Sequence, residues 1–156
     1  MTSTTDQLTA EKDCGTGGSE AVEDYIRAIF RTARGPRQIA STTEVADFLG
    51  VTPASVSNMF KKLARRELVV YLPYRGVSLT AGGERLALRV TRRHQLLEIF
   101  LVEALGMSPD RVHAEADRLE HHISTELEEL IAARLGERSL DPQGDLLPRG
   151  QSHGGW

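Results

Sequence analysis

Apolar and polar positions alternate with a helical period through the first third of the chain. Apolar side chains recur every three or four residues over residues 21–34, and the Gly35-Pro36 pair then predicts the end of this helix. Two shorter segments with the same period follow at residues 43–50 and 52–66, with Gly50 between them. Two short helices joined by a tight turn that contains glycine are typical of a helix-turn-helix.

Capping residues and a change of pattern define this motif further. Thr42 or Thr43 can cap the first short helix, and Thr52 followed by Pro53 predicts the start of the second. The pattern then changes to LVVYLPYRGVSLT, whose β-branched and aromatic residues favour two strands around a turn at residues 73–76. A hairpin in this place would be the wing of a winged helix-turn-helix.

The second half of the chain predicts helices alone. Three amphipathic segments lie at residues 83–107, 108–124 and 124–136, with Ser108 as the expected cap of the second and Gly136 at the end of the third. Three helices of this size are small for a separate stable domain. We therefore expect their apolar faces to pack on the front domain and on a second copy of the chain. These apolar residues are Leu96, Leu97, Phe100, Leu101, Leu105, Leu127, Leu130 and Ile131.

The expected fold is mostly α, with an N-terminal winged helix-turn-helix followed by an all-helical dimerisation domain. The expected segments are a flexible tail at 1–18, the winged helix-turn-helix domain at 19–90, a helical dimerisation domain at 91–140 and a flexible tail at 141–156. No apolar run approaches the roughly 20 residues of a membrane span, and the N-terminus lacks the pattern of a secretory signal. The single cysteine, Cys14, cannot form an internal disulfide, so a cytoplasmic location is expected.

The net charge of −3 over 156 residues hides an asymmetry between the two halves. Residues 20–93 hold 13 Lys and Arg against 7 Asp and Glu, a balance of +6, whereas residues 94–156 hold 5 against 12, a balance of −7. A basic front half can meet a polyanion, and an acidic rear half can meet cations.

The second short helix carries side chains suited to DNA. Short polar residues near a helix N-terminus can reach base edges in the major groove, while Lys and Arg contact phosphates. The candidates are Thr52, Ser55, Ser57, Asn58, Lys61 and Lys62 on this helix and Arg75 at the hairpin tip. The alternative is that these basic side chains only keep the helix surface hydrated and interact with the negative C-terminal end of the helix dipole. The helix-turn-helix motif and the positive charge of the front half nevertheless favour DNA binding.

The rear half carries a group of carboxylates and imidazoles with helical spacing. Asp117, Glu120 and His121 stand at i, i+3 and i+4, and together with His113 they fall within about one hundred degrees of a helix circumference. Other candidate donors are His94 and Glu98, an i, i+4 pair on the preceding helix, and Asp24 on the first helix. A single histidine on such a helix is more often a surface or hydrogen-bonded residue, and His94 with Glu98 can be an ordinary helix pair. Seven donors on three helices nevertheless favour a metal site.

Four stretches are similar to a known family. They are VEDYIRAIF, VADFLGVTPASVSNMFKKLARRELVVYLPYRGVSLTAGGE, RRHQLLEIFL and VHAEADRLEHHIS, and the last two are the more specific. The chain resembles, from about residue 19 to 147, the metal-dependent repressors that include the diphtheria toxin repressor (DtxR) and the manganese transport regulator (MntR). The resemblance implies a homodimer that binds operator DNA when loaded with a divalent metal and represses metal-uptake genes. A two-fold dimer would present two recognition helices to a palindromic site.

By position, the resemblance implies two ligand sets. Asp24, Asp117, Glu120 and His121 match one site. His94, Glu98 and His113 match the ancillary site of the iron-responsive branch.

The chain departs from the family pattern in two places. Arg27 stands where the manganese branch uses a carboxylate of a two-metal cluster, which favours two separated sites. We also expect a short form without the SH3-like domain of the iron repressors. The ancillary site would then be weak, completed by water, or filled by an Asp of the tail or by His153.

The donor types indicate which metal is bound. Asp24 and Asp117 are hard carboxylates at positions where the iron branch typically has Met and Cys. An oxygen-rich set with imidazoles suits Mn(II), with Fe(II) as the runner-up, while Zn(II), Co(II) or Cd(II) can substitute in vitro. A metal-dependent hydrolase is the alternative of another class, although the sequence shows no nucleophile–base pair, and a sensor of a small organic effector would leave the seven donors unexplained.

Overall fold

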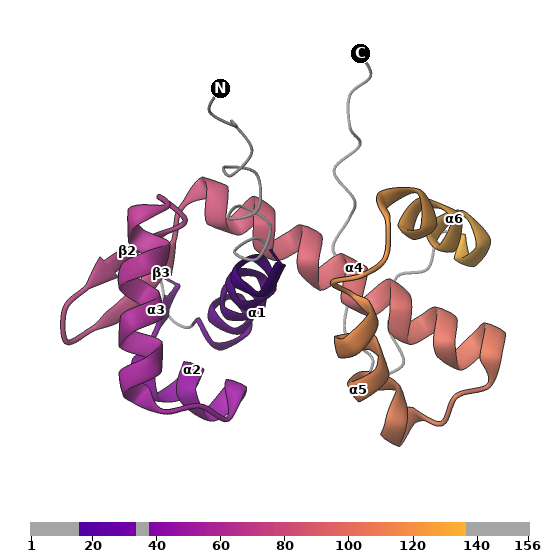
Figure 1. Ribbon diagram of the computed structural model, residues 1–156, viewed down its shortest axis with the longest axis horizontal. Helices are drawn as coiled ribbons and strands as arrows, with labels where there is room; N and C mark the ends of the chain where they lie inside the picture. Colours follow the sequence, from indigo (N-terminus) through magenta and orange to yellow (C-terminus); the bar gives the residue numbers. More distant parts are fainter. Residues whose placement is uncertain (1–15, 34–37, 137–156) are drawn as a thin grey trace, which may run out of the picture. The chain divides into compact units, whose positions relative to one another are not determined.

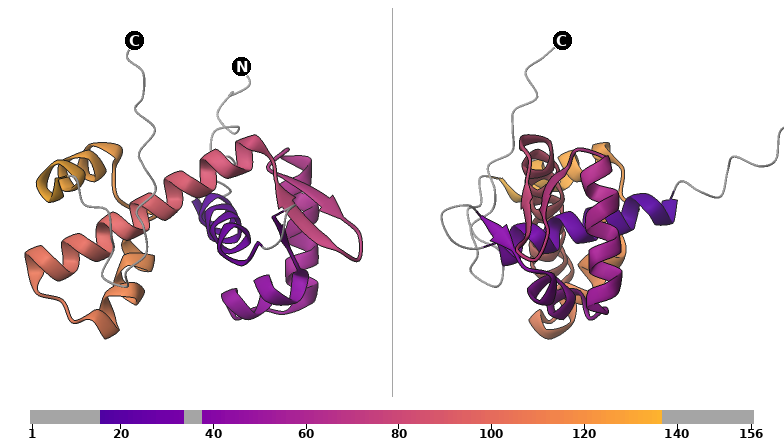
Figure 2. Two further views of the ribbon diagram at one scale, coloured as in Figure 1. Left: turned by 180° about the vertical axis from the view of Figure 1, so that it is seen from behind. Right: turned by 90° about the vertical axis from the view of Figure 1, so that its left-hand side faces the viewer.

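The computed structural model describes residues 16–33 and 38–136, and the two predicted tails lie mostly outside them. The chain divides into two compact units between Leu79 and Thr80, and each unit is described by itself. Figure 1 and Figure 2 show a helical unit with a small sheet and a unit made of helices alone. The architecture is the predicted one: mostly helical, with the small sheet in the N-terminal unit.

The N-terminal unit is a winged helix-turn-helix. Its elements are α1 (Thr16–Thr32), β1 (Ile39–Ala40), α2 (Thr42–Leu49), α3 (Pro53–Arg65), β2 (Val69–Leu72) and β3 (Gly76–Leu79). The strands form an antiparallel sheet in the order β1-β3-β2, in which Leu72 pairs with Gly76 across the wing turn. Strand β1 was not predicted; it pairs Ile39 with Ser78 and Ala40 with Val77.

The two short helices begin and end where their capping groups allow. Ser41, rather than Thr42 or Thr43, is the N-cap of α2: its hydroxyl accepts from the backbone N–H of Glu44, whose carboxylate accepts from the Ser41 N–H. The predicted cap of α3 is confirmed, because the Thr52 hydroxyl accepts from the Ser55 N–H at 3.3 Å.

An apolar core fixes the orientation of α3 on the sheet. Phe60 and Leu63 of α3 are fully buried, as is Val77 of β3, and the ring of Phe60 lies 6.1 Å from that of Tyr71. Gly76 has φ +118°, and a Cβ atom there would overlap the Ala40 carbonyl oxygen. The close approach of β1 and β3 therefore requires glycine at this position.

The C-terminal unit is built on one long helix. Its elements are α4 (Ala81–Leu105), α5 (Pro109–Leu119) and α6 (Thr125–Leu135), and α5 and α6 pack on different sides of α4 (Figure 1 and Figure 2). Thr80 and Ser124 cap α4 and α6 through their hydroxyls, and Ser108 is the N-cap residue of α5. The domain change predicted at residue 90 falls inside α4.

Many of the apolar side chains that were predicted to pack on the front domain and on a second copy of the chain instead form the core of this unit. The core residues are Leu96, Leu97, Ile99, Leu101, Val112, Ala116, Ile131 and Leu135. The prediction was therefore wrong for Leu96, Leu97, Leu101 and Ile131, because α5 and α6 already cover them. Three other members of the predicted face are exposed, namely Leu105, Leu127 and Leu130.

Candidate metal centre

Two packed helices of the C-terminal unit present the donor side chains. His94 and Glu98 lie one turn apart on α4, and His113 and Asp117 lie one turn apart on α5. Helix α5 is oriented by its fully buried residues, Val112 and Ala116, which pack in the core that includes Leu97 and Leu101 of α4. The donors of α5 flank this buried stripe and are thereby brought against α4.

His94 contacts donors through both of its ring nitrogens. Its Nδ1 atom lies 2.8 Å from Glu120 Oε2 and 3.4 Å from Asp117 Oδ1. Its Nε2 atom lies 3.0 Å from Glu98 Oε1 and 3.1 Å from His113 Nδ1. His94 therefore belongs to two groups of three donors, one with Glu98 and His113 and one with Asp117 and Glu120, and in each group the ligand atoms lie within 4.8 Å of one another.

His113 closes one of these groups from α5. Its Nδ1 atom lies 2.8 Å from Glu98 Oε1, and its Nε2 atom lies 3.7 Å from Asp117 Oδ2. The His94 and His113 rings meet edge to face, with centroids 4.7 Å apart. The group of His94, Glu98 and His113 is the set that the resemblance assigned to the ancillary site.

Burial makes the carboxylates of this centre unusual. Glu98 and Glu120 are only 2% and 1% exposed. Burial raises the pKa of Glu98, but hydrogen bonds and charge from His94 and then from His113 outweigh this effect and hold its pKa below the ordinary value. Buried carboxylates are found paired or coordinating a metal, because an isolated one is costly to desolvate.

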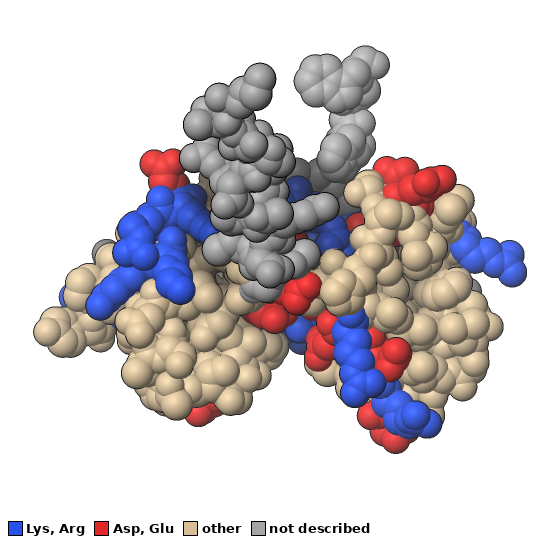
Figure 3. Space-filling model, in the orientation of Figure 1, with Lys and Arg blue, Asp and Glu red and all other residues tan. Residues whose placement is uncertain are grey.

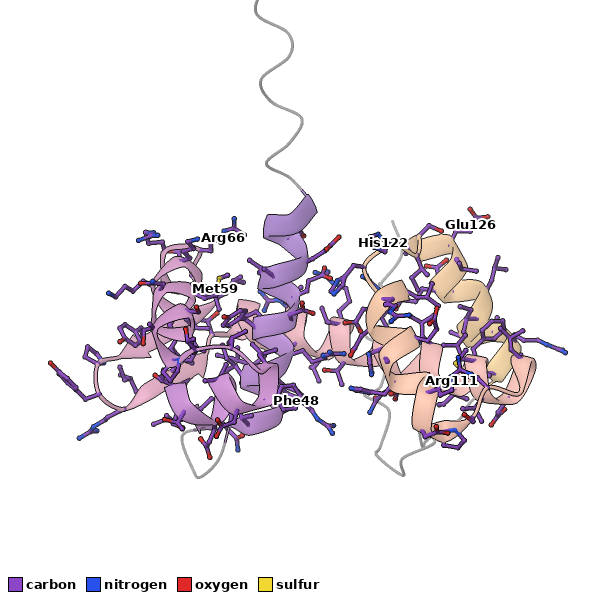
Figure 4. The ribbon with its side chains drawn as sticks, turned by 60° about the horizontal axis from the view of Figure 1, so that its bottom comes forward. Phe48, Met59, Arg66, Arg111, His122 and Glu126 are labelled. Carbon is purple, nitrogen blue, oxygen red and sulfur yellow. The ribbon has the colours of Figure 1, made fainter. Side chains whose placement is uncertain are left out.

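The position of His121 differs from the prediction. Helix α5 ends at Leu119; Glu120 keeps helical angles and donates its N–H to the Ala116 carbonyl, but His121 lies in the following turn. The placement of His121 on one helix face with the others was therefore wrong. Its Nε2 atom nevertheless lies 3.4 Å from Glu120 Oε1. His122 is exposed on the same turn (Figure 4).

A divalent cation fits the chemistry of these residues. The C-terminal unit offers two imidazoles and three carboxylates in one small volume, from His94, Glu98, His113, Asp117 and Glu120, with His121 beside Glu120. Oxygen and imidazole nitrogen are the donors that divalent first-row metals take in proteins. Asp24, the remaining predicted ligand, lies in α1 of the N-terminal unit.

Helix α3 and the wing hold the predicted DNA-contact residues on the surface. Thr52, Ser55, Asn58, Lys61, Lys62 and Arg75 are exposed, and Ser57 is half-buried. Figure 3 shows basic side chains gathered over the C-terminal part of α3, beside a surface of the same unit with few charges. Figure 4 labels Met59 of this helix and Arg66, the residue that follows its last turn. The hydroxyls of Thr52 and Ser55 are 2.9 Å apart, so each already has a partner within the cap.

Two charged residues near the centre were missed from the sequence. Arg93, next to His94, donates from Nη1 to the Glu120 carbonyl oxygen at 3.2 Å and from Nε to Glu128 Oε2 at 3.0 Å. Arg93 and Glu128 are separated by 35 positions, so no local pattern pairs them. The one available signal was that each charged residue lies beside apolar positions of an amphipathic helix.

Fold and site together define a class: a winged helix-turn-helix DNA-binding protein with a helical unit that gathers metal ligands. Two family models match the chain, the iron dependent repressor N-terminal DNA binding domain over residues 19–77 and the iron dependent repressor metal binding and dimerisation domain over residues 80–149. The chain belongs to this family, the DtxR/MntR family of metal-dependent transcriptional repressors. Its members are not enzymes, and the two domains make DNA and a second copy of the chain the partners.

Individual relatives agree with this assignment. The chain is 39% identical over 113 residues to an uncharacterised helix-turn-helix transcriptional regulator of Methanocaldococcus jannaschii, covering 72% of this chain and 90% of the relative. It is 40% identical over 107 residues to the transcriptional regulator MntR of Escherichia coli O157:H7, covering 69% of this chain and 68% of the relative. A solved manganese-dependent transcriptional repressor in complex with manganese matches with a TM-score of 0.74 and 40% identity.

The solved repressor is longer than the matched region. The match covers 81% of this chain and 58% of the solved chain.

Over residues 16–33 and 38–136, none of the helices combines the length and apolar character that a membrane crossing requires.

Proposed function

We propose that this protein is a Mn(II)-responsive repressor that acts in the cytoplasm as a homodimer on palindromic operator DNA. The observation that carries the proposal is the convergence of imidazoles and carboxylates from α4 and α5 around His94; the ligand groups found among the described residues contain no cysteine. Hard oxygen donors with imidazole suit Mn(II). The similarity to MntR and to the solved manganese-dependent repressor supports the same metal.

The proposed ligands fall into two sets. Asp117, Glu120 and His121 form one, and we expect Asp24 of α1 to complete it, as the resemblance to the family implies. His94, Glu98 and His113 form the other. The position of His94, with one ring nitrogen toward each group of donors, supports a centre in which the two sets are neighbours.

Coupling of metal to DNA follows from charge. Without a bound cation, the carboxylates of Asp24, Asp117 and Glu120 would repel one another if brought together. When bound, a divalent cation supplies two positive charges that offset this repulsion. We expect Asp24 then to hold α1, and with it the winged helix, in one arrangement, so that the protein binds DNA without a further ordering cost.

The proposed DNA contacts divide by chemistry. Thr52, Ser55, Ser57 and Asn58 near the start of α3 would reach bases, while Lys61, Lys62 and the wing residue Arg75 would contact phosphates. A homodimer presents two copies of α3 related by a two-fold axis, which matches a palindromic site.

Operator binding under buffered metal tests the proposal. DNA selected from a random pool by the Mn(II)-loaded protein is labelled, and its anisotropy is followed as the protein is titrated with Mn(II), anaerobic Fe(II), Zn(II) or chelator alone. We expect tight binding with Mn(II) and a loss of binding with chelator. Binding that is as tight in chelator as in Mn(II) would end the proposal.

An Fe(II)-responsive repressor is the second candidate. The matched domains are those of iron dependent repressors, and Fe(II) accepts the same donors. Operator binding that responds to Fe(II) at lower free concentration than to Mn(II) would favour this candidate.

A further inference from the structure

We infer that Arg93 is a positioning residue for the metal centre, acting through the backbone of Glu120, and that Glu128 holds Arg93 in place. The inference rests on the proposed function, because it concerns the same centre. Arg93 of α4 connects three segments: it donates to the Glu120 carbonyl oxygen after α5 and to the carboxylate of Glu128 in α6.

Adjacent residues of α4 hold Glu120 at two different atoms. His94 Nδ1 lies 2.8 Å from the Glu120 carboxylate, and Arg93 Nη1 lies 3.2 Å from its carbonyl oxygen. Carbonyls in the last turn of a helix lack a partner within that helix. Here α5 ends at Leu119, so the bond from Arg93 secures the point at which the chain turns away toward His121.

The charge of Arg93 requires compensation in this position. A guanidinium close to a cation site would weaken cation binding unless an anion balances it. Glu128 provides this anion at 3.0 Å from Nε, and the side chains of Arg93 and Glu128 are only 16% and 11% exposed, so solvent screens the pair little. Glu128 also lies in the first turn of α6, where the helix dipole favours a negative charge.

A neighbouring arginine offers a matched control. Arg92 Nη1 also contacts Glu128, at 3.4 Å from Oε1, and no bond from Arg92 to the Glu120 carbonyl is present among the described residues. Replacing Arg92 therefore removes one α4–α6 ion pair and leaves the bond to Glu120. Replacing Arg93 removes the bond to the Glu120 carbonyl and also the ion pair between Arg93 and Glu128.

The experiment compares Mn(II) affinity, measured by calorimetry, of the wild type, Arg93→Met and Arg92→Met. Outer partners of metal ligands typically contribute about 10–100-fold to affinity, so we expect Arg93→Met to bind about tenfold more weakly and Arg92→Met to stay within about twofold of the wild type. The absorption bands of bound Co(II) should shift in Arg93→Met alone, because they report ligand geometry rather than stability.

Two further variants keep the test decisive if Arg93→Met folds poorly. Arg93→Lys keeps the charge but replaces the forked guanidinium by one amine, so it should restore part of the affinity and not the Co(II) spectrum. Glu128→Gln keeps an acceptor and removes the balancing charge, so it should also weaken Mn(II) binding.

Each outcome points to a different conclusion. Mn(II) affinity and a Co(II) spectrum unchanged in Arg93→Met would overturn the inference while leaving the proposed function intact. Equal losses in Arg92→Met and Arg93→Met would also overturn it, because general α4–α6 packing would then be the cause. A wild-type protein that binds no Mn(II) would overturn the proposed function, and the inference with it.

Discussion

The Nδ1 atom of His94 lies 2.8 Å from Glu120 Oε2, and both residues are buried. A neutral imidazole has a lone pair on one nitrogen and a proton on the other. In one tautomer the lone pair of His94, which could bind a cation, therefore faces Asp117 and Glu120. In the other tautomer it faces Glu98 and His113. The two groups of ligands share this residue and compete for it.

Replacing His94 should weaken metal binding more than replacing a residue that only contacts a metal ligand. Because His94 belongs to both groups of donors, His94→Gln should lower Mn(II) affinity by more than the roughly tenfold to hundredfold typical of an outer partner. Calorimetry with Mn(II) measures this loss. His122→Gln is the matched control, because His122 is exposed on the turn after α5. This variant should bind Mn(II) as tightly as the wild type. Equal affinity in both variants would contradict the shared role of His94.

The metal preference should change with the donor at position 117. Asp117→Cys replaces a hard carboxylate by a soft thiolate, so the affinity for Mn(II) should fall and that for Zn(II) should rise. A shift in the ratio on the order of tenfold corresponds to about 1.4 kcal/mol. Competition between the two metals for the protein, followed by a chromogenic chelator, measures it. Asp117→Asn keeps an oxygen donor and should weaken the binding of both metals with little change in the ratio of their affinities. A Cys variant with the same ratio of Mn(II) to Zn(II) affinity as the wild type would argue against Asp117 as a ligand.

Local pattern was sufficient for most of the fold. Helical periodicity predicted the helices, and the β-branched run before the wing turn predicted strands β2 and β3. Strand β1 has two residues, too few to show a period, and exists because Ala40 pairs with Val77 far along the chain. The cap of α2 was missed by one or two residues, although Ser41 and Glu44 have the S-x-x-E spacing of a capping box, which is visible in the sequence.

The site was predictable as a set of donors but not as an arrangement. The spacing of His94 and Glu98 is visible in the sequence, whereas the contact between His94 and Glu120 spans 26 positions and depends on how α5 packs on α4. The end of α5 at Leu119 is a tertiary feature as well, and it places His121 in a turn rather than on the helix. For the same reason, no local pattern indicated the bond from Arg93 to the Glu120 backbone.

Lysine residues of α3 should determine the salt dependence of DNA binding. Lys61 and Lys62 are exposed, and each phosphate contact contributes about −0.9 to the slope of log affinity against log salt concentration. The double variant Lys61→Ala, Lys62→Ala should therefore reduce the magnitude of this slope by about 2. Anisotropy titrations at several salt concentrations, with Mn(II) present, measure the slope. The control variant, Arg111→Ala with Arg118→Ala, removes two exposed charges from α5 instead. An equal change in slope in this control would contradict phosphate contacts made specifically by α3.

The carboxylate of Asp110 stabilises the first turn of α5. A hydrogen bond from the Ser108 side chain, then one from the backbone, holds the pKa of Asp110 below its ordinary value of 3.8. A carboxyl group whose pKa is lower in the folded than in the unfolded state stabilises the fold above its ordinary pKa, and this contribution is lost as the pH falls through the lower, folded value. Asp110→Asn should therefore be less stable than the wild type near neutral pH, with a gap that narrows below pH 3.8. Urea unfolding of the metal-free proteins at a series of pH values measures the gap, and a difference that stays constant down to the acid limit would show that the charge of Asp110 contributes nothing.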